Sequence, residues 1–166
     1  MHPKAKYYIE KLQLERHPEG GYFKEIYRAA EIISLDAPRQ NLKRNVSTSI
    51  YFLLEGSKVS KFHKLKSDEL WHFYDGGSVK VYIIDERGKL SEIVLGRMIE
   101  DGEIFQTFIK KNNWFAAEVN DKRSFSLIGC TVSPGFDFSD FELAERDYLI
   151  KFFPEHRSLI LKFTNE

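Results

Sequence analysis

Two residues with acid–base chemistry, His63 and Glu69, lie close together in a segment that is otherwise rich in apolar and aromatic residues. Side chains alternate between faces along a β-strand, so Glu69, Trp71 and Phe73 share one face of an expected strand. If the preceding strand turns back so that His63 faces Glu69, an imidazole and a carboxylate meet beside an aromatic wall. Such a pair can bind a metal ion, or the carboxylate can orient the imidazole as a general base. A satisfied polar pair without chemistry is the alternative.

Three further polar residues lie on expected strands where a cavity could use them. Tyr51 interrupts the apolar run 48–54, and its hydroxyl would return a proton at the cavity mouth; a tyrosine of the core is the alternative. Gln106 lies within an apolar run, and we expect its amide to point into the cavity rather than to solvent. Glu25 adds a second carboxylate to the cavity if its side of the run 22–28 faces inward, and is a surface charge otherwise.

Other polar residues near these strands receive a structural interpretation. His72 falls on the strand face opposite Glu69, which predicts a structural or interfacial role. Asp137 and Asp140 alternate with phenylalanines, which indicates a strand edge with buried rings and solvated acids. The alternative is that these two carboxylates orient His63.

The elements that must position these residues are short strands separated by turn residues. Apolar runs recur at roughly 8–12-residue spacing, which is typical of an all-β sandwich or barrel. No helical pattern interrupts them, which argues against a parallel α/β sheet. The expected strands are 22–28, 48–54, 59–65, 70–74, 79–84, 90–95, 104–109, 114–119 and 125–132.

Segments of different character flank these strands. The first dozen residues, with Pro3 at the first position, and the run 145–153 show helical spacing, so we expect a helix at each end. The segment 30–45 is polar and contains Pro38 and a basic cluster at Arg39, Lys43 and Arg44. We interpret it as a solvated loop.

Composition narrows the class of protein. The chain has 166 residues, enough for one domain with its own core, which we expect to span 1–166. Lys plus Arg and Asp plus Glu each number 25, so the basic excess typical of nucleic-acid binders is missing. No run approaches the ~18 apolar residues of a membrane span. The charged amino end and the single cysteine predict a cytoplasmic protein without a disulfide framework.

The spacing around His63 resembles the first motif of the cupins, which reads Gly, five residues, His-x-His, three or four residues, Glu, six residues, Gly. Here Gly56 is followed by six residues, His63-x-Leu65, three residues, Glu69, six residues and Gly76. The stretch 110–115 corresponds to the second cupin motif, and Phe115 occupies the place of its histidine. Of the four usual cupin metal ligands only His63 and Glu69 remain, so we expect no metal and no other cofactor.

Five strings resemble one group of uncharacterised cupin-like proteins. They cover the chain from residue 17 to about 144 and read HPEGGYFKEIYR, STSIYFLL, FHKLKSDELWHFYDG, NNWFAAEV and SLIGCTVSPGFDFSDFELA. The resemblance implies a double-stranded β-helix, the cupin jelly roll, with flanking helices, and it implies a homodimer. The group resembles the dTDP-sugar 3,5-epimerases in fold, which implies a sugar or a nucleotide-sugar-like ligand.

Three functions are compatible with these residues. The first is a metal-independent epimerase or isomerase in which His63 takes a proton, Glu69 fixes its tautomer and Tyr51 returns the proton. Trp71, Phe73, Gln106, Phe115 and Glu25 would then line the ligand. The alternative is a filled barrel in which Trp71, Phe73 and Phe115 are ordinary core residues. The second is a non-catalytic sensor or carrier of a small molecule. The third is a metal-dependent oxygenase or decarboxylase, which is disfavoured because Leu65 and Phe115 replace two of the usual metal ligands. We expect a small molecule and a second copy of the chain as partners, and neither nucleic acid nor membrane.

Overall fold

The computed structural model describes residues 1–36, 39–40 and 42–165, and nearly half of them belong to antiparallel strands. The nine expected strands and a helix near each end fall at or near the expected positions, and the described residues form four further short strands that were not expected. In chain order they are α1 Pro3–Leu12, β1 Glu15–Arg16, β2 Tyr22–Arg28, β3 Ile32–Ser34, β4 Lys43–Asn45, β5 Thr48–Glu55, β6 Val59–Leu65, β7 Asp68–Gly76, β8 Val79–Ile84, β9 Leu90–Leu95, β10 Gln106–Ile109, β11 Trp114–Val119, β12 Phe125–Ser133, β13 Phe141–Leu143, α2 Arg146–Phe152 and α3 Arg157–Lys162, with short 3-10 turns at Ile99–Asp101, Phe138–Asp140 and Pro154–His156.

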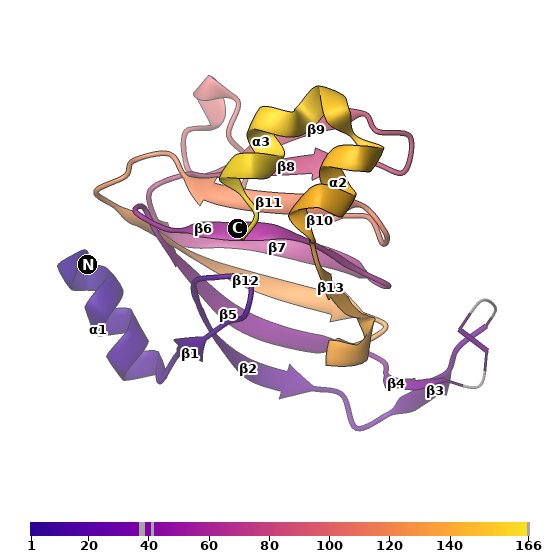
Figure 1. Ribbon diagram of the computed structural model, residues 1–166. Helices are drawn as coiled ribbons and strands as arrows, with labels where there is room; N and C mark the ends of the chain where they lie inside the picture. Colours follow the sequence, from indigo (N-terminus) through magenta and orange to yellow (C-terminus); the bar gives the residue numbers. More distant parts are fainter. Residues whose placement is uncertain (37–38, 41, 166) are drawn as a thin grey trace.

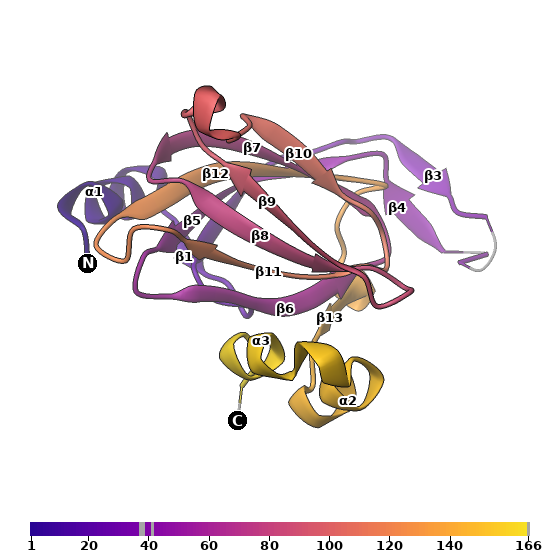
Figure 2. The ribbon, with the colours of Figure 1, turned by 90° about the horizontal axis from the view of Figure 1, so that it is seen from above.

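Two sheets face each other and form the jelly roll (Figures 1 and 2). The first has six strands in the order β1-β2-β5-β12-β7-β10, and the second has five in the order β13-β6-β11-β8-β9. Neighbouring strands within both sheets are antiparallel. The prediction of an all-β jelly roll with short helices at both ends is confirmed.

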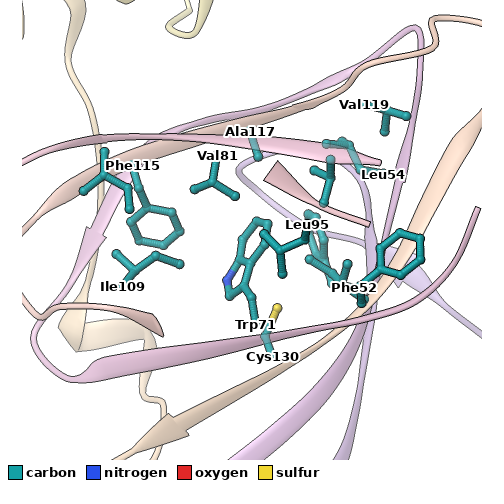
Figure 3. Close-up of a cluster of buried hydrophobic side chains, with 14 residues drawn as sticks. Phe52, Leu54, Trp71, Val81, Leu95, Ile109, Phe115, Ala117, Val119 and Cys130 are labelled. Atoms are coloured by element: carbon teal, nitrogen blue, oxygen red, sulfur yellow. The ribbon is translucent and has the colours of Figure 1, made fainter. Parts of the chain in front are cut away.

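The space between the sheets is filled by one cluster of buried apolar side chains, drawn in Figure 3. Alternation along the strands explains its membership, because Phe52 and Leu54 of β5 point inward together, as do Trp71 and Phe73 of β7. Phe115 of β11 contributes from the opposite sheet. Phe52, Trp71 and Cys130 of this cluster also border a cavity between the sheets.

Helices cover the outer faces of both sheets (Figure 2). Leu149 of α2 and Ile160 and Phe163 at the carboxyl end pack on the outer side of the five-stranded sheet, against Phe62 and other residues. The helix α1 packs through Ala5 on the outer side of the six-stranded sheet. These covered outer faces leave the space between the sheets as the place for a ligand.

The segment 30–45 differs from its prediction as a solvated loop. Strands β3 and β4 pair in an antiparallel hairpin that extends from the barrel (Figure 1). Arg39 and Arg44 fold back, with nitrogens 3.2 and 2.8 Å from Oδ2 of the buried Asp140. Two guanidinium groups compensate this carboxylate, so Asp140 anchors the hairpin and does not orient His63. Pro38 lies outside the described residues.

Within the described part of the chain, no helix is long and apolar enough to cross a membrane.

Candidate functional site

A cavity of about 350 Å³ opens between the two sheets. Strands of both sheets, the turn before β2 and the segment before β13 supply its walls. Its lining residues are His17, Glu19, Phe23, Glu25, Arg28, Thr48, Ile50, Phe52, His63, Leu65, Glu69, Trp71, Cys130, Val132, Phe136, Asp137, Phe138 and Phe141. Apolar walls with a few convergent polar groups are typical of small-molecule sites.

A tight turn places Glu19 in this cavity. Gly20 and Gly21 have φ values of 116° and 72°, which residues other than glycine rarely adopt. A Cβ atom at Gly20 would also collide with the carbonyl oxygen of Val59. The turn can therefore pack closely on β6, where the amide of Lys61 donates to the carbonyl of Glu19 at 2.9 Å.

The Glu19 carboxylate is buried and accepts contacts from three side chains. Oε1 lies 2.7 Å from the hydroxyl of Ser60, and Oε2 lies 3.0 Å from Nε2 of His63 and 3.3 Å from Nδ1 of His17. Burial alone would raise the pKa of this carboxyl. The charge of His63 and the hydrogen bonds from His17 and Ser60 outweigh burial and lower it. Glu19 is therefore a buried carboxylate held between two imidazoles.

Both ring nitrogens of His63 are used within the protein. Nδ1 lies 2.7 Å from the carbonyl oxygen of Lys61, which can only accept, so Nδ1 carries a proton. Nε2 faces the Glu19 carboxylate at 3.0 Å and donates to it when the ring holds a second proton, a form that burial disfavours by lowering the pKa of His63 although the charge of Glu19 opposes this. His63 consequently has no nitrogen left for a ligand, and its place is that of a positioning residue for Glu19.

His17 is the imidazole with a free nitrogen. Its Nδ1 faces Glu19, while its Nε2 makes no hydrogen bond to any described residue. The ring lies among four phenylalanines, with centroid distances of 4.7 Å to Phe23, 5.7 Å to Phe141 and 6.2 Å to both Phe52 and Phe138. The Nε2 atom is thus the imidazole nitrogen that a ligand in the cavity can use.

A second carboxyl, that of Glu69, lies in the cavity on strand β7. It is 8% exposed, and its Oε2 atom has no hydrogen-bond partner among the described residues. Burial and the charge of Glu19 raise the pKa of Glu69 to about 8, so this carboxyl is protonated at neutral pH. The Nε1 atom of Trp71, two residues along the same face, also lacks a partner in the described structure. These two groups can donate hydrogen bonds to a ligand.

Charged residues of β2 and of the segment before β13 complete the lining. Arg28 and Glu25 form a two-pronged ion pair, with nitrogen–oxygen distances of 2.9 and 2.7 Å. The Asp137 side chain accepts hydrogen bonds from the backbone and hydroxyl of Ser139 through its Oδ1 atom. The basic Arg28 is therefore held by the protein rather than left open to a ligand.

The structure brings four of the predicted site residues to the cavity: His63, Glu69, Trp71 and Glu25. The expected meeting of His63 with Glu69 takes another form, because the hydrogen-bonding carboxylate of His63 is Glu19. Glu25 borders the cavity and is also exposed, so its position combines the two expected alternatives.

Four predicted site residues lie elsewhere. Tyr51 is on the outer side of β5, 6.1 Å from the ring of Tyr74, because the neighbouring Ile50 and Phe52 point inward. Gln106 is exposed and lies 3.2 Å from His72, which pairs with it across β7 and β10. The cavity predictions for these two residues are wrong.

Phe73 and Phe115 are residues of the filled core instead of the cavity lining. The Phe115 ring packs 4.0 Å from the ring of His63, to which it is opposite in the pairing of β11 with β6. Both phenylalanines therefore pack in the core instead of contacting a ligand. The contact with Phe115 also helps to hold the His63 ring in place.

Two of the four usual cupin ligand positions hold Leu65 and Phe115, whose side chains have no donor atoms. Among the described residues, no group of three or more His, Cys, Asp or Glu side chains is arranged to bind a metal ion.

Sequence reasoning missed His17 and Glu19. They stand two residues apart in the string HPEGG, which carries part of the family resemblance but to which no chemistry is assigned above. The pair of glycines after Glu19 was the available signal, because consecutive glycines mark a backbone that must turn sharply or approach another strand.

A family model identifies the family of this chain. A family model described as "Cupin superfamily (DUF985)" matches residues 6–144. Uncharacterized protein YML079W of Saccharomyces cerevisiae is 31% identical over 143 residues, covering 80% of this chain and 71% of the yeast protein.

Solved structures extend this likeness to the fold. A hypothetical protein from Leishmania major has a TM-score of 0.90 at 30% identity, covering 98% of this chain and 99% of its own. Protein SO0799 from Shewanella oneidensis has a TM-score of 0.87 at 38% identity, with 97% of both chains covered. A dTDP sugar isomerase from Desulfovibrio desulfuricans has a TM-score of 0.54 at 16% identity, covering 81% of this chain and 86% of its own, so it shares the fold alone.

Proposed function

We propose that this chain, which belongs to the DUF985 family of the cupin superfamily, is an isomerase-type enzyme that moves a proton on a small carbonyl compound without a metal. His17 is the base of this proposal and Glu69 the acid. One observation carries it: the buried Glu19 carboxylate lies between two imidazoles, and only Nε2 of His17 remains open to the cavity.

The tautomer of His17 depends on whether its Nδ1 atom donates a hydrogen bond or accepts one. The Glu19 carboxylate lies 3.3 Å away and the Glu19 backbone N–H lies 3.4 Å away. A hydrogen bond to a charged acceptor is roughly twice as strong as a neutral one, so the carboxylate favours a proton on Nδ1. The lone pair of Nε2 then faces the cavity, and the carboxylate stabilises the imidazolium that forms when Nε2 takes a proton.

Glu69 supplies the complementary group. A carboxyl with a pKa of about 8 still carries its proton at neutral pH and can donate it to a carbonyl oxygen. As Nε2 of His17 takes the proton from the carbon beside the carbonyl, the C–H electron pair forms the C=C bond of an enol. The carbonyl oxygen meanwhile takes the proton of Glu69. Return of a proton to carbon, and of the hydroxyl proton to Glu69, completes an isomerisation or epimerisation.

Aromatic rings make the surroundings of the two proposed groups apolar. Phe23, Phe138 and Phe141 surround the His17 ring, and Trp71 lies beside Glu69 on β7. An apolar surrounding strengthens the electrostatic effect of Glu19 on His17. The sugar isomerase supports this proposal by fold analogy only.

Proton exchange tests the proposal without knowledge of the natural substrate. Ketoses, aldoses, phenylacetone and phenylpyruvate would be incubated with the protein in D₂O, and loss of the C–H signal beside the carbonyl followed by proton NMR. We expect exchange with at least one compound, and a loss of about 100-fold or more in His17→Gln, the scale of general-base catalysis. Glu19→Gln should lose activity while keeping the size of the side chain.

His72→Gln is the matched control, because His72 lies on the outer face of β7 beside Gln106. It should leave the exchange rate unchanged. Binding of a compound without any exchange would overturn the enzyme proposal in favour of a sensor or carrier. Exchange that persists in His17→Gln would assign the base to another group.

A further inference from the structure

We infer that the cavity selects uncharged substrates and rejects anionic ones, nucleotide sugars included, because Glu25 keeps Arg28 from binding a ligand anion. The inference rests on the proposed function and adds the substrate class of the same cavity. Glu25 is its specificity-determining residue, since it decides whether the guanidinium is free.

All five N–H donors of Arg28 are used within the protein. Nε and one terminal nitrogen donate to the two oxygens of Glu25 at 2.9 and 2.7 Å. The remaining donors reach Oδ1 of Asn45 at 2.9 Å and the carbonyl oxygen of Phe136, twice, at 3.2 Å. A guanidinium has five donors and no more, so a phosphate or carboxylate can bind Arg28 only by displacing a protein group.

The other ionisable groups of the lining offer no replacement. Glu19 is a carboxylate in contact with His63 and His17, and Asp137 is a carboxylate whose pKa is lowered chiefly by the hydroxyl and backbone of Ser139. Arg28 is the one lysine or arginine among the described lining residues. An anion entering the cavity would lose its hydration without meeting a free positive charge, which is costly.

The unpartnered polar atoms indicate what the cavity accepts instead. Oε2 of Glu69 and Nε1 of Trp71 are buried without hydrogen-bond partners in the described structure. A protonated carboxyl and an indole N–H both donate, and they suit the oxygen of an uncharged carbonyl compound. Buried polar atoms of this kind are normally satisfied, so a ligand is the natural partner here.

A matched pair of ligands tests the inference. Phenylacetone and phenylpyruvate share a benzyl ketone and differ in that a methyl group is replaced by a carboxylate. Calorimetric titration at pH 7.5 should give phenylacetone an affinity at least about tenfold higher than that of phenylpyruvate, equivalent to one unpaired charge contact. Neither dTDP nor a dTDP-sugar should compete with phenylacetone.

Glu25→Gln then releases two donors of Arg28. The ratio of phenylpyruvate affinity to phenylacetone affinity should rise about tenfold, the scale of a hydrogen bond to a charged group. Glu142→Gln is the control, because it removes the carboxylate of another exposed ion pair, with Lys64, outside the cavity. That variant should leave the ratio unchanged. Thermal melting confirms that both variants are folded.

The outcomes separate this inference from the proposed function. Equal or tighter binding of phenylpyruvate or a dTDP-sugar to the native protein overturns the selection for uncharged ligands and leaves the proton-transfer proposal standing. An unchanged ratio in Glu25→Gln overturns the role of Glu25. Failure of both phenyl ketones and the uncharged sugars to bind overturns the proposed function together with this inference.

Discussion

The Nε2 atom of His63 lies 3.0 Å from Oε2 of Glu19, while its Nδ1 atom lies 2.7 Å from the carbonyl oxygen of Lys61. This arrangement fixes the ring from both sides. His63, the histidine that the sequence pattern singled out, thus positions Glu19, a carboxylate that the pattern did not single out. The proposed general base is therefore His17, which contacts the same carboxylate, and not His63.

His63→Gln should therefore destabilise the fold more than it affects ligand contacts. Removing the imidazole leaves the Glu19 carboxylate buried with one partner fewer, which costs about 1–3 kcal/mol. Urea unfolding at neutral pH measures this cost, and His72→Gln, on the outer face, should differ little from the native protein. If His63→Gln abolished phenylacetone binding with an unchanged unfolding midpoint, His63 would be a ligand-contacting residue after all.

Glu69 makes the stability depend on pH. Its pKa is about 8 in the folded protein and near 4.5 when unfolded. Between these values the folded state holds a proton that the unfolded state has lost, so the free energy of unfolding falls as pH rises. The slope contributed by this one group is about 1.4 kcal/mol per pH unit.

Glu69→Gln should remove that dependence, because an amide resembles the neutral acid and does not titrate. Urea unfolding of both proteins at pH 5.5, 6.5 and 7.5 measures the difference. The variant should gain stability relative to the native protein at each step, and most of that gain should be complete by about pH 8. Parallel stability curves would show that Glu69 is ionised in the folded protein.

The sequence predicted the sheets well because alternation and turn residues are local signals. Strands β8, β9 and β11 have the expected bounds, and each is an apolar run closed by Gly, Asn or Asp. The hairpin β3–β4 was missed because its anchor is not local. Arg39 and Arg44 are a solvated basic cluster in the sequence, and only the fold brings Asp140 to them.

The site was predicted in part for a related reason. Alternation placed Glu69 and Trp71 on one face, but it does not say which face of a neighbouring strand is inside. Gln106 pairs with His72, which was expected outside, so the pairing register decides its position. Glu19 is joined to His63 by a turn that closes over β6, a contact that no spacing rule predicts.

We expect the protein to form a homodimer that involves the outer edge of β2. Strand β1 pairs only with Tyr22 and Phe23, so the rest of this edge has no partner strand among the described residues. Ile26 and Tyr27 are 49% and 54% exposed there. Unpaired edges with apolar side chains invite pairing with another chain. Light scattering at micromolar concentration should give twice the 19.5 kDa chain mass.

Tyr27→Lys should shift this assembly to the monomer, because lysine on an edge strand opposes pairing. Tyr148→Lys is the matched control, since Tyr148 is a similarly exposed tyrosine on α2. A native protein of 19.5 kDa would contradict the dimer. A dimer that persists in Tyr27→Lys and separates in Tyr148→Lys would place the interface on the helical side.

We also expect less than one equivalent of tightly bound transition metal in protein purified without added metal. A catalytic metal site takes about three protein ligands. Leu65 and Phe115 occupy two of the usual cupin ligand positions and have no donor atoms. His63 has both nitrogens bound within the protein, so binding a metal would require breaking its contact with Glu19 or with Lys61. Mass spectrometry of the metal content, before and after treatment with a chelator, measures this.

One equivalent of iron, zinc, manganese or nickel that resists the chelator would contradict the prediction. Loss of that metal in His17→Gln, with retention in His156→Gln as the control, would then make His17 a ligand instead of a base.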